Sequence, residues 1–107
     1  MQNSYPEWNK VANYILSAEA EADLTSILEY ISQDSPQSAL QVWDRFLEVF
    51  RVLGEHPDSG HYREDLASRP VRFFPVFSYM VVYTSGSRPV EIARFLGVSQ
   101  DVESILR

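Results

Sequence analysis

The strongest constraint on the fold is the stretch 70–84, PVRFFPVFSYMVVYT, which is dominated by β-branched and aromatic residues. These residue types suit a pleated, half-buried surface, so the stretch predicts β-structure. Pro75 and the pair Phe77-Ser78 interrupt it and divide it into two strands. A third apolar run follows a polar turn, which predicts a three-stranded antiparallel meander with strands over 71–76, 79–84 and 90–96.

A sheet this apolar must be covered on one face, and two upstream stretches have helical periodicity. The first helix is predicted over 18–33, after the N-cap residue Ser17 and with acidic residues in its first turns. The second begins after Ser35, with Pro36 at its first position, and is predicted to run to about residue 53. The apolar stripes consist of Ala20, Leu24, Ile27, Leu28 and Ile31 in the first helix, and of Ala39, Val42, Trp43, Phe46, Val49, Phe50 and Leu53 in the second.

The remaining segments complete an α+β domain. Gly54 and Pro57 are expected to end the second helix, and a polar connection with both histidines follows. The prediction is a strand, a helix hairpin packed on a small antiparallel sheet whose last three strands form the meander, and a short C-terminal helix. The segments outside the hairpin and the meander are an N-terminal arm over 1–12, a first strand over 13–17, a connection over 55–68 and a closing helix over 99–107. The domain itself is predicted over 13–107.

Composition narrows the class of protein. The 107 residues suffice for one domain, and the absence of cysteine excludes disulfides and thiolate chemistry. No apolar run reaches the roughly 20 residues that span a bilayer. The N-terminus also lacks the features of a secretory signal, so we expect a cytoplasmic protein that does not enter the membrane. A net charge of −6 argues against broad nucleic-acid binding, which depends on neutralising phosphates.

Charge is unevenly distributed along the chain: residues 1–68 have a net charge of −8, and residues 69–107 have a net charge of +2. In the basic half, Arg72 and Arg94 lie on mainly apolar strands, where a desolvated cation needs a partner. We expect both side chains to lie near each other on the sheet face opposite the helices, in a groove for a partner chain or an anionic group. The alternatives are a salt bridge to an acid of a helix or loop, and simple exposure to solvent.

Other polar residues have simpler explanations. Tyr79 and Tyr83 share a strand face and are candidates for contact with a partner, although core tyrosines with a satisfied hydroxyl are more common. His56 and His61 lack the spacing of a helical metal site. The sequence contains no phosphate-binding glycine loop, nucleophile elbow or zinc motif, so we predict no catalytic residue, no metal and no cofactor.

The order and spacing of these segments resemble the RelE/ParE superfamily of bacterial toxins, and most closely its ParE branch. The resemblance covers about residues 14–106 and is carried by YILSAEAEADLTSILEYIS, SPQSALQVWDRFLEVFRVLGEHPDSG, VRFFPVFSYMVVYT and VEIARFLGVSQDVESIL. It implies the toxin of a type II toxin–antitoxin pair, which binds and inhibits DNA gyrase without catalysis and is neutralised by a cognate ParD-like antitoxin.

We expect the antitoxin to bind through an apolar and acidic C-terminal segment. This segment would add a strand at a sheet edge or place a helix in a groove beside the hairpin, and its carboxylates would pair with Arg72 or Arg94. The residues that we expect to bind a partner are Arg69, Arg72, Tyr79, Tyr83, Arg94 and Asp101.

One departure from the ParE pattern lies at the end of the last strand. ParE-like toxins often follow a leucine there with His-Gly-x-Arg-Asp, whereas this chain has Gly97 and Gln100 at the histidine and arginine positions and retains Asp101. One alternative is therefore a homologue of low potency that only forms an antitoxin complex. The other is a RelE-like ribosome-dependent mRNA endonuclease, which is disfavoured because RNA cleavage needs an acid, a base and cations, and no His or Tyr follows Tyr83.

Overall fold

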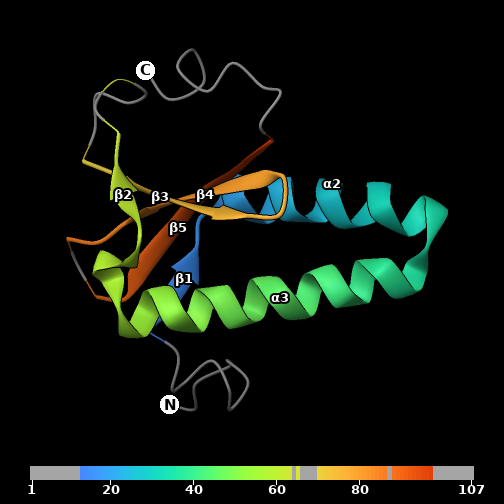
Figure 1. Ribbon diagram of the computed structural model, residues 1–107, viewed down its shortest axis with the longest axis horizontal. Helices are drawn as coiled ribbons and strands as arrows, with labels where there is room; N and C mark the ends of the chain where they lie inside the picture. Colours follow the sequence, from blue (N-terminus) through green and yellow to red (C-terminus); the bar gives the residue numbers. More distant parts are fainter. Residues whose placement is uncertain (1–12, 64, 66–69, 87, 98–107) are drawn as a thin grey trace.

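A computed structural model describes residues 13–63, 65, 70–86 and 88–97 of the chain (Figure 1). These residues form two long helices packed on a sheet, which confirms the α+β class. The predicted arm over 1–12 and the predicted closing helix over 99–107 lie outside them. In chain order the elements are β1 (Tyr14–Leu16), α2 (Ala18–Asp34), α3 (Pro36–Glu55), the 3-10 turn η1 (Pro57–Ser59), β2 (His61–Tyr62), β3 (Arg72–Val76), β4 (Tyr79–Thr84) and β5 (Val90–Gly97).

The sheet has five strands in the order β1-β5-β4-β3-β2, and β3, β4 and β5 form the predicted antiparallel meander. β1 pairs parallel with β5, with Tyr14 opposite Val90, so the sheet is mixed and not purely antiparallel as predicted. Both helices separate β1 from β5 in the chain, and a connection of this length allows parallel pairing. β2 was not predicted; it lies in the polar connection and pairs with β3, with His61 opposite Phe73.

Both helices begin at their predicted cap residues. The hydroxyls of Ser17 and Ser35 each accept the backbone N–H three residues later, at 3.0 and 3.1 Å. α3 ends at Glu55, two residues beyond the predicted end near residue 53 and shortly before Pro57, which was expected to end it together with Gly54. A Cβ at position 54 would lie 3.1 Å from the backbone of Asn13, so this glycine permits a close approach between chain segments and does not end the helix.

The helix hairpin is longer than the sheet that it covers. α2 and α3 lie side by side and extend beyond one end of the sheet, where a short turn joins them (Figure 1). Their 17 and 20 residues correspond to about 25 and 30 Å. We call residues 18–24 and 46–55 the base of the hairpin, and residues 25–34 and 36–45 its tip. Neither of these two described helices is long and apolar enough to cross a membrane.

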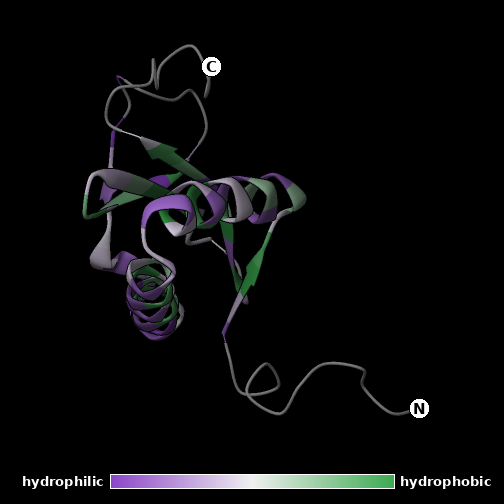
Figure 2. Ribbon diagram, turned by 90° about the vertical axis from the view of Figure 1, so that its right-hand side faces the viewer, coloured by the Kyte–Doolittle hydropathy of each residue, from purple (hydrophilic) through white to green (hydrophobic). Residues whose placement is uncertain are grey.

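β3, β4 and β5 carry apolar side chains on both faces of the sheet. Figure 2 shows strands with largely hydrophobic residues beside helices in which hydrophobic and hydrophilic residues alternate. Within β5, the pairing changes register between Arg94, which faces Val82, and Ile92, which faces Tyr83, so that Ala93 forms a bulge. The larger cluster packs against the helices and includes Val76, Val81, Tyr83, Val90, Ile92 and Phe95 from the strands. The smaller cluster lies on the other face and consists of Val71, Phe73, Val82 and Leu96, with Met80 against it.

Candidate partner-binding surface

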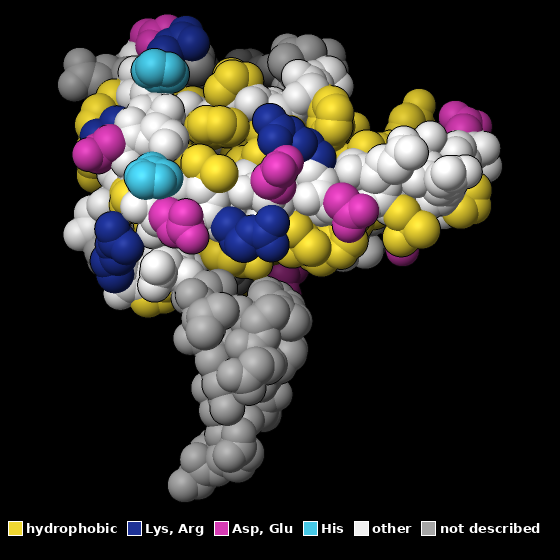
Figure 3. Space-filling view, turned by 60° about the horizontal axis from the view of Figure 1, so that its bottom comes forward, with side chains coloured by type: hydrophobic (Ala, Val, Ile, Leu, Met, Phe, Trp, Pro, Cys, Tyr) yellow, Lys and Arg dark blue, Asp and Glu magenta, His cyan; other side chains and the backbone are white. Residues whose placement is uncertain are grey.

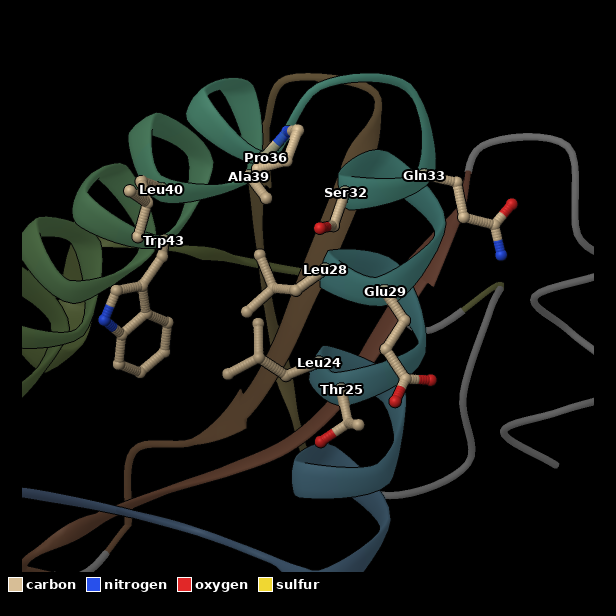
Figure 4. A pocket seen from close by; sticks show the side chains of 10 residues that line it. All are labelled: Leu24, Thr25, Leu28, Glu29, Ser32, Gln33, Pro36, Ala39, Leu40 and Trp43. Atoms are coloured by element: carbon tan, nitrogen blue, oxygen red, sulfur yellow. The ribbon is translucent and has the colours of Figure 1, made fainter.

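A groove lies between α2 and α3 at the tip of the hairpin (Figure 4). Its volume is about 1050 Å³. Leu24 and Leu28 point from α2 toward Trp43 of α3, whereas the polar ends of Glu29 and Gln33 point away from α3 (Figure 4). The lining residues are Leu24, Thr25, Leu28, Glu29, Ser32 and Gln33 from α2, and Pro36, Ala39, Leu40 and Trp43 from α3.

The groove exists because the apolar stripes of the helices continue past the end of the sheet. In the base, Ala20 and Phe46 are completely buried. In the tip, Leu28 and Trp43 are only partly buried, and Leu40 is 65% exposed. Both Leu28 and Trp43 belong to the predicted apolar stripes, and both pack against the edge of the core. A stripe that stays partly exposed in this way is typical of an interaction surface.

Glu29 is the one charged residue that lines the groove. Elsewhere α2 contains four further acidic residues and no basic one. The tip of α3 contains one basic residue, Arg45, whose Nη1 donates to the Glu48 carboxylate at 2.7 Å. At the far end of the hairpin, Figure 3 shows hydrophobic and acidic side chains and no lysine or arginine on the face in view. The lining is therefore mainly apolar, with a single acidic residue among its polar members.

Arg94 forms an ion pair with Asp23 of α2. Its Nε and Nη2 atoms donate to the two carboxylate oxygens at 2.7 and 3.2 Å, and the Phe95 N–H donates to the same carboxylate at 2.9 Å. The side chains of Arg94 and Asp23 are 28% and 18% exposed. The hydrogen bond to Asp23 raises the pKa of Arg94, and burial opposes this effect. Asp23 thus accepts the backbone N–H of Phe95 on β5, at a point beyond the end of β1. Of the alternatives considered for Arg94, the salt bridge to an acidic residue of a helix is the one that the structure shows.

Arg72 is also held by groups of its own domain. It donates to the Gly60 carbonyl at 2.9 Å and to the Ser85 hydroxyl at 3.0 Å, and it lies 3.1 Å from the exposed carboxylate of Asp58. Its guanidinium carbon lies 4.1 Å from the centre of the Tyr62 ring, which is a cation–π contact. These contacts fasten η1 and β2 to β3 and β4.

Tyr79 and Tyr83 both contribute to the cluster that faces the helices, so they share a strand face as predicted. Tyr83 is completely buried, and its hydroxyl donates to the Pro57 carbonyl at 2.6 Å and accepts the N–H of Gly60 at 2.8 Å. Burial raises the pKa of Tyr83 above its ordinary value. Tyr79 is partly buried, with its ring centre 6.2 Å from that of Phe46. Tyr83 is therefore a core residue with a satisfied hydroxyl.

The prediction that Arg72 and Arg94 lie together on the open face of the sheet is wrong. Arg72 is opposite Tyr83, whose side chain packs toward the helices, whereas Arg94 is opposite Val82, whose side chain packs on the other face. The bulge at Ala93 changes the alternation within β5, and a sequence pattern does not reveal where such a bulge lies.

Two of the predicted site residues cannot be placed. Arg69 and Asp101 lie outside the described residues, and the partner-binding roles of all six predicted residues stay predictions. None of the residues that line the groove was among these six.

One signal in the sequence did point to the groove: Leu40 is apolar and lies beside Ala39 and Trp43 at the start of a long helix. Among the side chains that the structure describes, no three of His, Asp or Glu come together as metal ligands.

The fold and the groove define a small α+β protein whose helix hairpin carries an apolar groove. Comparison with known families gives a more specific result, because the model of the family described as the ParE toxin of type II toxin-antitoxin system, parDE, matches residues 14–102. The chain therefore belongs to the ParE toxin family, as its sequence predicted.

A solved structure described as "Chromosomal ParDE TA system from P. aeruginosa" contains a chain of the same fold. That chain is 19% identical to this one and superposes with a TM-score of 0.66, over 80% of this chain and 95% of its own length. No curated protein sequence matches the chain significantly.

Proposed function

We propose that the chain is the toxin of a type II toxin–antitoxin pair, which acts in the cytoplasm by binding DNA gyrase and is neutralised by a ParD-like antitoxin. The observation that carries this proposal is the family match over residues 14–102. The apolar groove between the helices supports it, because such a surface is suited to contact with a protein.

The state of the arginines favours binding over catalysis. An RNA-cleaving enzyme needs cations that can stabilise a phosphate in the transition state. Tyr83, the last tyrosine of the chain, is buried and bonded to backbone groups, so it is not placed to exchange a proton with a substrate. Five of the six described arginines already donate to oxygen atoms of the chain, namely Arg45, Arg63, Arg72, Arg88 and Arg94.

The decisive experiment is expression of the chain in bacteria, alone and with the product of the adjacent gene. We expect growth arrest with the chain alone and recovery with both proteins. The purified chain should inhibit supercoiling by gyrase and should leave mRNA on translating ribosomes intact. Codon-dependent cuts in mRNA would instead assign the RelE-like activity.

The alternative of a low-potency homologue rests on Gly97, which lies at the end of β5 opposite Tyr79. It replaces the histidine that ParE-like toxins often have there. If the unaltered chain binds the antitoxin but leaves growth unaffected, the combined substitutions Gly97→His and Gln100→Arg test this alternative. Growth arrest by the double variant alone would assign low potency to these two positions.

The proposed acidic segment of the antitoxin would have to compete with groups that already hold the arginines. Its carboxylates would replace Asp23 at Arg94 or Asp58 at Arg72. If this exchange occurs, Arg94→Ala should weaken the antitoxin complex by more than about tenfold and mainly speed its dissociation. Unchanged affinity in both Arg72→Ala and Arg94→Ala would place the antitoxin elsewhere on the domain.

A further inference from the structure

We propose that Phe77, on the turn between β3 and β4, is an aromatic anchor through which the free toxin binds a folded target protein. The choice of gyrase as that target rests on the proposed function, whereas the anchor itself is argued from the turn. Three features carry the inference: a backbone conformation that opposes a side chain, a ring that stays exposed, and an uncharged stretch of chain around it.

The turn holds Phe77 in a conformation that disfavours a side chain. Val76 and Tyr79 form the last pair between β3 and β4, so the loop consists of Phe77 and Ser78 alone. Of these two residues only Phe77 has a positive φ, 56°, which is the pattern of a type II′ turn. Glycine normally occupies this first position, because a residue with a Cβ is strained there. The backbone of the turn therefore selects against phenylalanine.

Packing within the domain accounts for only part of the ring. Phe77 lies edge-on to Phe46, with ring centres 6.5 Å apart, yet 63% of the residue is exposed. A glycine at this position would relieve the turn and give up little buried surface. Residues that are kept in strained conformations are found preferentially at functional sites. We therefore assign the exposed part of the ring to contact with another molecule.

The ring is positioned before any partner binds. Phe46, on which it rests, is completely buried, and Tyr79 on the other side of the turn also lies edge-on to Phe46, with ring centres 6.2 Å apart. Both strands that lead into the turn are paired up to its last residues. An aromatic side chain that is already held in place loses little conformational entropy on binding, which favours its use as an anchor.

The chemistry of the turn favours a protein over a nucleic acid or a membrane. Residues 73–84, which include the turn and nearly all of both strands, contain no charged residue. The phosphates of nucleic acids and of anionic lipids are bound by lysine and arginine, and this stretch offers neither. An uncharged aromatic ring instead matches an apolar pocket on a protein, where a few such residues contribute most of the binding energy.

The shape of the turn favours a folded target over a peptide segment. A two-residue turn that carries one exposed ring is a narrow convex feature, so its complement is a concave pocket, which folded proteins provide. A lone helix or an extended segment has no pocket of its own to receive a ring. Neither Phe77 nor the two rings beside it line the groove between α2 and α3, so the anchor and the groove are made by different residues.

Inhibition of gyrase by purified variants tests the anchor. Phe77→Gly removes the ring and relieves the turn, so it should raise the concentration that inhibits supercoiling by roughly tenfold to thirtyfold. Phe77→Tyr keeps a ring at the same position and should retain most of the inhibition. The same order is expected for growth arrest when each variant is expressed alone in bacteria.

Matched controls separate the contact from a loss of folding. Tyr30 is an aromatic residue of similar exposure, 68%, within α2, and Tyr30→Ala should leave inhibition of gyrase unchanged. Phe77→Gly should bind the antitoxin as tightly as the unaltered chain does, which requires a folded domain. A benzoylphenylalanine placed at position 77 should cross-link to purified gyrase on illumination, and one placed at position 30 should not.

Three results would overturn the inference. The first is equal inhibition of gyrase by Phe77→Gly and the unaltered chain. The second is a parallel loss of antitoxin affinity in Phe77→Gly, which would make the antitoxin the occupant of this surface. The third is a dimer in sedimentation experiments that Phe77→Gly converts to a monomer, which would make a second copy of the chain the occupant.

Failure of the proposed function gives a different pattern. An unaltered chain that arrests growth without inhibiting gyrase has another target, and loss of growth arrest in Phe77→Gly would then still support the anchor. An unaltered chain that affects neither growth nor gyrase, and does not cross-link from position 77, would overturn both proposals.

Discussion

The base and the tip of the helix hairpin have the same sequence pattern but different surroundings. Both contain apolar residues at helical spacing, yet Phe46 in the base is completely buried and Leu40 in the tip is 65% exposed. The difference arises because the sheet ends beneath the middle of the hairpin (Figure 1). Periodicity therefore identifies the face of a helix that is apolar, whereas the extent of the neighbouring elements decides what covers it.

The largest change in stability is expected when a buried residue in the base of the hairpin is truncated. Phe46 contacts Phe50 and Phe95, with ring centres 6.3 and 5.1 Å away, so Phe46→Ala should lower the free energy of unfolding by about 3–5 kcal/mol. Leu40→Ala in the tip should change it by less than about 0.5 kcal/mol. Urea denaturation followed by circular dichroism measures both. Similar losses in the two variants would contradict the division into a buried base and an exposed tip.

A smaller effect is expected from the polar contact that joins the base to β5. Asp23→Ala leaves Arg94 and the Phe95 N–H without their partner, which should cost about 1.5–3 kcal/mol. The matched control is Glu48→Ala, which removes an exposed pair with Arg45 and should cost about 0.3–0.5 kcal/mol. Equal costs, measured by the same denaturation, would mean that the Asp23 pair is as well hydrated as the exposed one.

The sequence predicted most of the fold because its signals are local. Ser17 and Ser35 mark helix starts by their own hydrogen bonds. No local signal predicts the sheet face on which Arg94 lies, because that face depends on a bulge that forms only when β5 pairs with β4. Leu40 was the one signal for the groove, because the groove itself depends on the length of the sheet relative to the hairpin. The meander and its helix cover were also predicted correctly, whereas the face of Arg94 and the parallel pairing of β1 depended on strand contacts that the sequence pattern does not reveal.

Tyr83 of β4, in the core cluster that packs against the base, makes the stability of this region depend on pH. Tyr83→Phe removes the hydroxyl that serves Gly60 and Pro57, and should cost about 1–2 kcal/mol near neutral pH. Burial raises the pKa of Tyr83 in the folded state, so on alkalinisation the unfolded chain loses its proton first. The free energy of unfolding should therefore fall from about pH 10 upward, until the pH passes the pKa of folded Tyr83.

The variant Tyr83→Phe should fall less steeply over the same range, although Tyr14, whose pKa burial also raises, still contributes. The control is Tyr30→Phe on the exposed surface of the tip, which should keep the profile of the unaltered chain. A profile for Tyr83→Phe identical to that of the unaltered chain would show that Tyr83 does not cause the alkaline loss of stability.

The smallest expected effect concerns the turn between β3 and β4, which packs on the base through Phe77. This residue has a φ of 56°, in the left-handed region that costs a residue with a Cβ roughly 1–2 kcal/mol, and its ring lies edge-on to Phe46 with centres 6.5 Å apart. Phe77→Ala removes the ring and keeps the strain, whereas Phe77→Gly removes both. The glycine variant should therefore be more stable than the alanine variant by about 1 kcal/mol. At Ser78, where φ is not positive, the order should reverse, with Ser78→Ala more stable than Ser78→Gly. Thermal unfolding of the four variants measures these differences. Equal stabilities of Phe77→Ala and Phe77→Gly would mean that the positive φ at position 77 imposes no strain on a residue with a Cβ.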